Sequence, residues 1–414
     1  MSALDVGDIK SLYPALRRRV GGGPALYTDA PGGTQVPAPV IQAMVEYLEV
    51  SNANEDGAFA TSEETGRIVA EARVAAADLL GCGPDEIVFG ANMTTLAFAL
   101  SRVIARELRD GDEVVVTRLD HDANVAPWLA AAEDSGATVR WVDVTTPECD
   151  LDLESLDAAI GERTRVVAFT LASNAVGTIS RAHEVVARAR AAGAVVVADA
   201  VHYAPHRLLD VRALDVDFLF CSPYKFFGPH MGIMYGTRAL LEKWRPYKVR
   251  PASDAVPSSW ETGTKSHEAL AGLVACVDYL AGLAGAGGDQ RQRIEASMAA
   301  IERHESALAR RFLAGLERVG DVELFGVRDL DAPERRTPTF AVRVPGVVPA
   351  EAAARLGSRG IFVWDGNYYA LALMERLGLE ESGGAVRIGF CHYHDDGDVD
   401  RVLDALAELT GAAP

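Results

Sequence analysis

Short apolar segments alternate with helix-like segments through the middle of the chain. The strand-like segments are rich in valine and other apolar residues, and they lie at residues 113–117, 138–142, 166–170, 195–198 and 218–221. Such alternation forms a mostly parallel sheet with helices on both faces. The most apolar segments suit strands that are buried on both sides. The sequence therefore predicts an α/β fold built around one mostly parallel sheet of the seven-stranded type.

The alternation of strand-like and helix-like segments ends before residue 265. A long helical region at 267–318, interrupted by glycines at 282–288, leads into short strand-like and helix-like segments that end near residue 409. A chain of 414 residues also exceeds the usual size of one compact core. We expect a large domain at 31–290 and a small α+β domain at 291–414, with an N-terminal arm at 1–30 that joins the small domain.

Charge and composition exclude several classes of partner. The net charge of −19 disfavours nucleic acid and anionic membranes, which both bind basic surfaces. The five cysteines are scattered without metal-site spacing, so we expect no metal site, no disulfide framework and a reducing cytoplasmic location. The sequence contains neither an apolar signal segment at its start nor a run of 18 apolar residues, so we expect no membrane association.

An acid and a lysine follow two neighbouring apolar segments. Asp199 ends the segment 195–198, and Lys225 lies just after the segment 218–221. This arrangement is what a pyridoxal 5′-phosphate (PLP) site needs, because the lysine forms a Schiff base and the carboxylate keeps the pyridine nitrogen protonated. A strand-capping Asp and a surface Lys would look the same, so the pair alone is ambiguous.

Further polar groups follow other predicted strands. Thr94 and Thr95 open a helix after Gly90, which is typical of an anion site but also of an ordinary helix cap. His121 could stack on a pyridine ring or lie in solvent, and Asn174 could donate to a ring oxygen or cap a turn. Because the carboxyl ends of the strands meet at one edge of such a sheet, where ligands bind, these groups together favour a PLP site.

Five motifs carry a resemblance to a known family. They lie at residues 120–128, 173–178, 199–202, 222–225 and 261–264. With them the chain resembles the class V aminotransferase family of fold type I PLP enzymes and, within it, the cysteine desulfurases and desulfurase-like proteins. The resemblance extends from about Tyr27 to Leu409. It implies the fold type I architecture and a homodimer.

The resemblance also implies a role for each matching residue. Lys225 would form the Schiff base and carry the proton, and Arg387 would bind the α-carboxylate of an amino acid substrate, as its planar guanidinium suits. The other implied cofactor contacts are Asp199 at the pyridine nitrogen, His121 on the ring face, Asn174 and His202 near the ring hydroxyl, Thr94, Ser222 and Tyr224 at the phosphate, and Thr264 at the phosphate of the neighbouring subunit.

The sequence departs from the desulfurases in the small domain. Where those enzymes carry a nucleophilic cysteine on a loop, this chain has Tyr369, and Trp364 stands in the place of an upstream arginine. Tyrosine cannot hold a persulfide, so the usual sulfur relay is not expected. Trp364, Tyr368 and Tyr369 would shape the substrate pocket instead, with Asn54 and the turn 29–34 near its entrance. Cys391 could replace the lost cysteine, but a buried core cysteine is the favoured interpretation.

The resulting prediction is a PLP enzyme that acts on an amino acid. The first choice of reaction is C–S cleavage or β-elimination on a cysteine-derived substrate, because a lyase needs no enzyme cysteine. The alternatives are transamination or epimerisation, which use the same Cα proton, and a carbon–carbon or ring-forming step. An inactive scaffold is a further alternative, which the retention of Lys225, Asp199 and Arg387 opposes.

Overall fold

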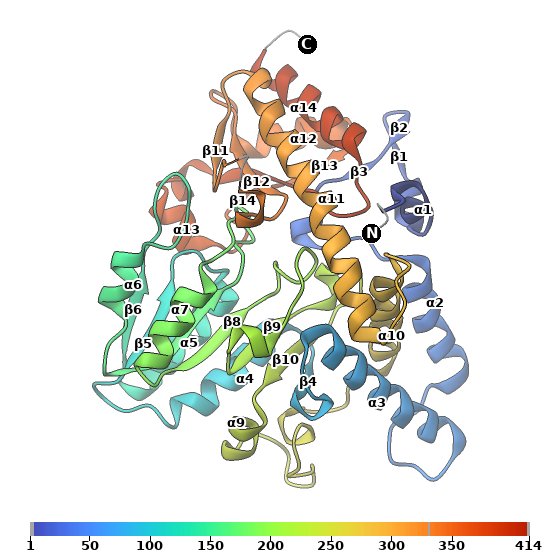
Figure 1. Ribbon diagram of the computed structural model, residues 1–414, viewed down its shortest axis with the longest axis vertical. Helices are drawn as coiled ribbons and strands as arrows, with labels where there is room; N and C mark the ends of the chain where they lie inside the picture. Colours follow the sequence, from blue (N-terminus) through green and yellow to red (C-terminus); the bar gives the residue numbers. More distant parts are fainter. Residues whose placement is uncertain (1–3, 330–331, 412–414) are drawn as a thin grey trace.

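The computed structural model describes residues 4–329 and 332–411 (Figure 1). A large sheet forms its lower part, with the strand order β4-β10-β9-β8-β7-β5-β6. Strand β10 is antiparallel to both of its neighbours, whereas β9, β8, β7, β5 and β6 pair in parallel. The strands are β4 (Ile87–Gly90), β5 (Glu113–Thr117), β6 (Thr138–Val142), β7 (Thr164–Thr170), β8 (Val195–Asp199), β9 (Phe218–Cys221) and β10 (Gly232–Gly236).

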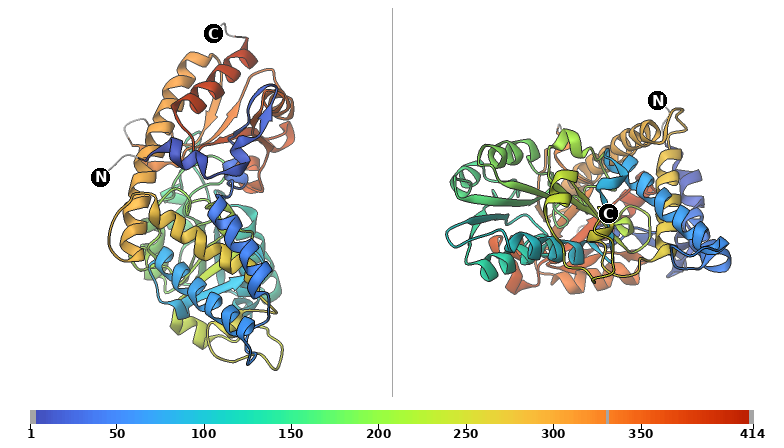
Figure 2. Two further views of the ribbon diagram at one scale, coloured as in Figure 1. Left: turned by 90° about the vertical axis from the view of Figure 1, so that its right-hand side faces the viewer. Right: turned by 90° about the horizontal axis from the view of Figure 1, so that it is seen from below.

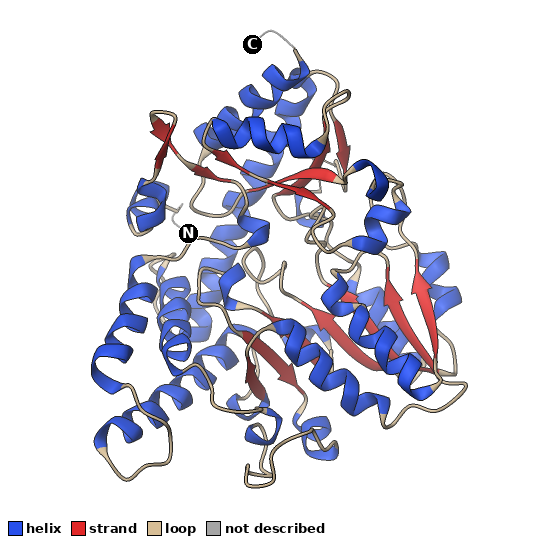
Figure 3. Ribbon diagram, turned by 180° about the vertical axis from the view of Figure 1, so that it is seen from behind, coloured by secondary structure: helices blue, strands red, loops and turns tan. Residues whose placement is uncertain are grey.

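Helices cover both faces of this sheet (Figure 3). Successive strand residues point to opposite faces, so Val115 packs in one core and its neighbours Val114 and Val116 pack in another. The first core contains α3 (Ala60–Leu80), α6 (Leu153–Ala159), α7 (Ala182–Ala191), α8 (Val211–Leu214) and α10 (His267–Gly282). The second contains α4 (Met93–Ala105), α5 (Ala126–Ser135) and α9 (Arg238–Lys243).

A smaller antiparallel sheet, of order β11-β12-β15-β14, lies above the large one. Its strands are β11 (Glu323–Phe325), β12 (Thr339–Arg343), β14 (Trp364–Gly366) and β15 (Ala385–Gly389), and its helices are α12 (Pro349–Ser358), α13 (Leu371–Arg376) and α14 (Asp396–Thr410). Helix α11 (Gln290–Val319) runs along both parts (Figure 2). Its first half packs in the core of the large sheet through Ile294 and Ile301, and its second half packs in the core of the small sheet through Phe312.

The N-terminal segment lies against the small sheet. It forms α1 (Val6–Ser11), a hairpin of β1 (Arg19–Val20) and β2 (Gly23–Pro24), and then β3 (Leu26–Tyr27). Strand β3 pairs in parallel with β13 (Ile361–Phe362), and Asp29 forms a bridge with Gly389 at the end of β15. Helix α2 (Ala38–Glu46) then packs on α10. Residues 26–33 therefore enter the space between the two sheets.

The predicted fold class is confirmed, and the predicted strands of the large sheet lie within two residues of the observed ones. Several short elements were not predicted. Strand β14 has the sequence Trp-Asp-Gly and follows no apolar alternation, so only its pairing with β15 makes it a strand. Helices α1 and α13 have six residues each, too few to show a helical period. In the described part of the chain, no helix is long and apolar enough to cross a membrane.

Candidate active site

Two adjoining cavities lie between the carboxyl edge of the large sheet and the small sheet. The inner cavity measures about 70 Å³, and the outer one about 530 Å³. They share four lining residues, His121, Asn174, Tyr224 and Lys225. The inner cavity adds Thr94, Asp199, His202 and Ser222, and the outer one adds Trp364, Tyr368, Tyr369 and Arg387. The fold therefore brings together twelve of the residues predicted from the sequence.

Asp199 and Lys225 lie in the wall of the inner cavity. Asp199 ends β8, and burial raises its pKa to about 6, partly offset by a 2.8 Å hydrogen bond from the backbone N–H of Val201. Lys225 ends the 3-10 turn Pro223–Lys225, and its ammonium donates to the carbonyl of Pro31. Burial, with the charge of Arg387, lowers the pKa of Lys225 to about 7. A substantial fraction of the amine is therefore neutral, and so nucleophilic, at neutral pH.

His121 follows β5 and faces both cavities. Its Nδ1 accepts the backbone N–H of Ala123 at 3.0 Å, so the proton of the neutral ring lies on Nε2. Burial and the cations Lys225 and Arg387 lower the pKa of His121 to about 4, which keeps the ring uncharged. The ring stacks on that of Tyr369, with centroids 5.5 Å apart and planes 21° apart. His121 thus presents a neutral flat face to the cavities.

Asp120 precedes this histidine in the chain and is buried. It bonds to the hydroxyl of Thr117, and its Oδ1 accepts the side-chain amide of Asn124 at 2.7 Å. Burial raises the pKa of Asp120 to about 8, and the nearby charge of Asp199 adds to the shift. The carboxyl group is therefore mostly protonated at pH 7, and its bonds fix the turn that carries His121.

The N-terminus of α4 lies at the inner cavity. Asn92 caps the helix, and its Oδ1 accepts both the backbone N–H and the hydroxyl of Thr95, at 2.8 and 2.9 Å. Thr94 lines the cavity, whereas the hydroxyl of Thr95 is bonded to the cap and lines neither cavity. A side chain at Gly232 would begin 2.4 Å from the backbone of Asn92, so glycine lets β10 approach this helix start. Helix N–H groups at such a start favour an anion.

Arg387 is the buried cation of the outer cavity. It lies on β15 with only 4% of its surface exposed, its Nη1 donates to the carbonyl of Asn174 at 2.9 Å, and its guanidinium lies 4.4 Å from the centre of the Tyr368 ring. Its Nε is buried without a partner, and among the residues that the structure describes it forms no ion pair with an acid. Burial lowers its pKa to about 10, which still leaves it charged at neutral pH.

The loop after β14 closes the outer cavity. Tyr368 and Tyr369 both adopt left-handed backbone conformations, with φ of 54° and 59°. The backbone N–H of Asp122 donates to the carbonyl of Tyr369 at 2.7 Å, and the side-chain amide of Asn174 donates to the carbonyl of Tyr368 at 2.9 Å. The Oδ1 of Asn174 is buried without a partner. The loop is therefore attached to the large sheet through its backbone while the residue Tyr369 is 72% exposed.

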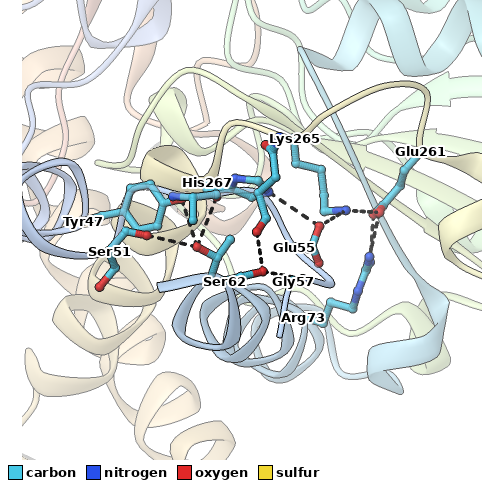
Figure 4. A network of polar contacts seen from close by, with 12 residues as sticks. Tyr47, Ser51, Glu55, Gly57, Ser62, Arg73, Glu261, Lys265 and His267 are labelled. Carbon is cyan, nitrogen blue, oxygen red and sulfur yellow. Dashed lines mark hydrogen bonds and ion pairs between the residues drawn. The ribbon is translucent and has the colours of Figure 1, made fainter. Parts of the chain in front are cut away.

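Thr264 and Asn54 do not join the other predicted residues within one chain. Thr264 lines a separate cavity of about 300 Å³ beside His230. Its loop is held by a two-point ion pair between Glu261 and Arg73, and Lys265 links Glu261 to Glu55 (Figure 4). Asn54 is exposed, and its carbonyl accepts the hydroxyl of Ser62. These contacts join the Thr264 loop and the segment around Asn54 into one surface.

The sequence predicted the turn 29–34 at the substrate entrance, without a separate role for any one of its residues. Asp29 has an oxygen buried without a partner, and burial raises its pKa to about 6 against the opposing charges of Arg387 and Lys225. Gly32 lines the outer cavity. Both belong to the turn 29–34, whose proline and paired glycines indicate a tight backbone but not which side chains each residue contacts.

None of the five cysteines, all of which the structure describes, lines either cavity. Four of them are buried, and Cys82 is half-buried. Cys391 is fully buried, and burial raises the pKa of its thiol well above the ordinary value. Since a thiolate is the nucleophilic form, the environment of Cys391 is that of a core residue.

The sequence pattern of the family described as aminotransferase class-V matches residues 26–402. The chain belongs to this family. It is 32% identical over 423 residues to a probable cysteine desulfurase 2 of Mycobacterium leprae, covering 97% of this chain and 96% of the relative. It is 30% identical over 409 residues to an uncharacterized protein of Mycobacterium tuberculosis, covering 98% of this chain and 100% of the relative.

Solved structures give the same assignment. The apo cysteine desulfurase of Thermococcus onnurineus NA1 superposes with a TM-score of 0.88 at 27% identity, covering 99% of both chains. Class-V aminotransferases are PLP-dependent enzymes of fold type I, and this chain is such an enzyme. The predicted family is thus confirmed over most of the chain.

Proposed function

We propose that this class-V enzyme binds PLP in the inner cavity and acts there on an α-amino acid. The donor set fits the cofactor: a lysine amine, a buried carboxylate, a neutral imidazole face and a helix N-terminus border one cavity. The unpartnered Oδ1 of Asn174 leaves a buried polar atom available to a ligand. When bound, PLP supplies an electron sink that stabilises negative charge at the substrate Cα.

Each lining residue then has a role that its environment supports. Lys225 would hold the cofactor aldehyde and, once released from it, move the Cα proton, which its pKa of about 7 favours. Asp199 would pair with the pyridine nitrogen, because a pKa of about 6 leaves it mostly ionised at neutral pH. His121 would lie on the ring face, Asn174 and His202 near the ring hydroxyl, and Thr94, Ser222 and Tyr224 at the phosphate.

The single observation that carries the amino acid assignment is Arg387. A buried guanidinium with an unpartnered Nε, which lies beside a cavity and forms no ion pair among the described residues, is costly unless an anion binds there. A substrate carboxylate would fill this place. Lys225 and Arg387 line the same outer cavity, so one ligand can reach both.

The reaction that these residues support best is C–S cleavage by β-elimination on a cysteine-derived substrate. Lys225 would take the Cα proton, the Cβ–S bond would break, and its electron pair would leave with sulfur. This step needs no enzyme thiol, which agrees with five cysteines that line neither cavity. Transamination and epimerisation begin with the same proton transfer and differ in where the proton returns, and a carbon–carbon step is a further alternative.

We also propose a homodimer in which Thr264 reaches the phosphate site of the partner subunit. In its own chain Thr264 lies outside the inner cavity, on a loop that the Glu261–Arg73 ion pair holds in place. Ile41, Val45 and Leu48 of the nearby segment 38–51 are exposed, as apolar residues of a subunit interface are in an isolated chain.

An assay of the PLP-loaded enzyme with L-cysteine, S-substituted cysteines and other L-amino acids tests the reaction. Sulfide or thiol released together with pyruvate, in equal amounts, is the expected result. Amino-group transfer to a 2-oxo acid, or exchange of the Cα proton with loss of optical activity and no release of sulfur, would contradict the lyase and support an alternative.

A further inference from the structure

The outer cavity carries opposite charges at different depths. Arg387 is positive and buried. Asp365 and Glu380, which line the same cavity, are acidic and lie nearer the surface: Asp365 is exposed and Glu380 is half-buried. Both oxygens of Glu380 accept the side-chain amide of Asn367, at 2.9 and 3.2 Å. An amide is neutral, and Glu380 forms no ion pair with the other residues that the structure describes, so its negative charge at the cavity wall has no paired cation.

The unpaired N–H groups of Arg387 lie near a further donor, the neutral indole N–H of Trp364. Nη1 is taken by the carbonyl of Asn174, and Nε has no partner. A side chain at Gly32 would begin 3.4 Å from Nη2 of Arg387 and 2.5 Å from Nε1 of Trp364. The indole N–H and the free edge of the guanidinium therefore border the same space, which exists because residue 32 is glycine.

We infer that the substrate is an amino acid with a single carboxylate and a neutral or cationic side chain. Arg387 and the Trp364 N–H hold the α-carboxylate, while Asp365 and Glu380 repel a second one. Trp364 is neutral, so it supplies its N–H without adding positive charge that would offset the two carboxylates. The inference rests on the proposed function, in which Arg387 binds an α-carboxylate.

Isosteric ligand pairs test the charge selection. The PLP-loaded enzyme is titrated with L-glutamine and L-glutamate, with L-asparagine and L-aspartate, and with the amide and acid forms of S-carboxymethyl-L-cysteine, and binding is followed by the change in cofactor absorbance. Each amide should bind at least about tenfold more tightly than its acid, since one like-charge contact at a half-buried site supports such a factor. An acid within about threefold of its amide, in any pair, overturns the inference.

Two glutamates give a matched pair of variants. Glu380→Gln should reduce the discrimination between amide and acid to less than about threefold. Glu381→Gln removes the same charge from the adjacent position, which is exposed and does not line the cavity, and should leave the discrimination as it is in the parent. Equal effects of the two variants overturn the inference. A holoenzyme whose spectrum responds to no amino acid overturns the proposed function instead.

A conservative change tests the second donor. Trp364→Phe keeps a ring and removes the N–H, so L-serine should bind about tenfold more weakly, as expected for one hydrogen bond to a charged group. Ethanolamine, which has no carboxylate, should bind with equal affinity to the parent and to the variant. Gly32→Ala should weaken the binding of L-serine when it is made in the parent. It should have little further effect on that binding when it is combined with Trp364→Phe. If Trp364→Phe loses affinity for both ligands alike, or loses none for L-serine, the role of the indole N–H is overturned.

Discussion

Trp364 and Arg387 lie opposite each other across strands β14 and β15, and both side chains line the outer cavity. The buried strand β15 supplies the cation, and the short edge strand β14 supplies the aromatic wall. The backbone of Gly32, from the N-terminal segment, borders a third side of this space, and the missing side chain leaves room between Trp364 and Arg387. The carboxylate site is therefore built from three segments that are far apart in the sequence.

Arg387→Lys should raise KM for an amino acid substrate about 10- to 100-fold, because an ammonium cannot reproduce the planar fork of a guanidinium. Steady-state kinetics on the PLP-loaded enzyme measure this change. Arg343→Lys, on the neighbouring strand β12 and bonded to Ser382 at the surface, is the control and should leave KM unchanged. An unchanged KM in Arg387→Lys would place the carboxylate elsewhere.

The apoprotein should combine with PLP faster as the pH rises through about 7. Only the neutral amine attacks the aldehyde, and the pKa of Lys225 is lowered to about 7 by burial and by Arg387. The rate should therefore level off above about pH 8, which stopped-flow absorbance can follow. A rate that continues to rise towards pH 10, where an ordinary lysine titrates, would show that the environment of Lys225 does not shift its pKa.

Asp120→Asn should stabilise the protein, and the gain should grow between about pH 4 and pH 8. The folded pKa of Asp120 is raised to about 8, against about 4 in the unfolded chain. Across this window the unfolded chain has released the proton while the folded chain retains it, so the parent loses stability as pH rises. The Tm difference between variant and parent, measured at pH 5, 7 and 9, checks the sign. A constant difference would contradict it.

Alkylation of native enzyme with iodoacetamide should leave its activity unchanged. Four cysteines are buried, and the pKa of the half-buried Cys82 is raised to about 12, so thiolate is scarce at all five positions. Mass spectrometry after a timed reaction counts the modified thiols, and the same sample is assayed. Activity that falls in step with the modification of one cysteine would restore a sulfur relay through that residue.

Hybrid dimers test the position of Thr264. Lys225→Ala and Thr264→Ala subunits are each expected to be defective, in catalysis and in PLP affinity respectively. If Thr264 serves the partner subunit, a mixed dimer contains one site with both residues intact, so mixing should restore activity. Mixtures that show only the average of the two separate variants would place Thr264 in its own site or in neither.

The sequence predicted the large sheet because its strands are apolar and regularly spaced, and it predicted the residues at their carboxyl ends because one sheet edge collects them. Arg387 was found through the family resemblance. The turn 29–34 was predicted at the substrate entrance, but the individual contacts of Asp29 and Gly32 were not, because they come from segments more than 190 positions away. The domain boundaries near 30 and 290, and the role of Asn54, stay predictions.

The absorbance spectrum of the purified protein tests the central claim most directly. The parent, saturated with PLP and then freed of excess, should show the band near ~420 nm that a lysine Schiff base of PLP absorbs. Lys225→Ala should lack that band while its far-ultraviolet circular dichroism matches the parent. A colourless parent that takes up no PLP, or a Lys225→Ala variant that keeps the band, would contradict the assignment of Lys225 and the inner cavity as the cofactor site.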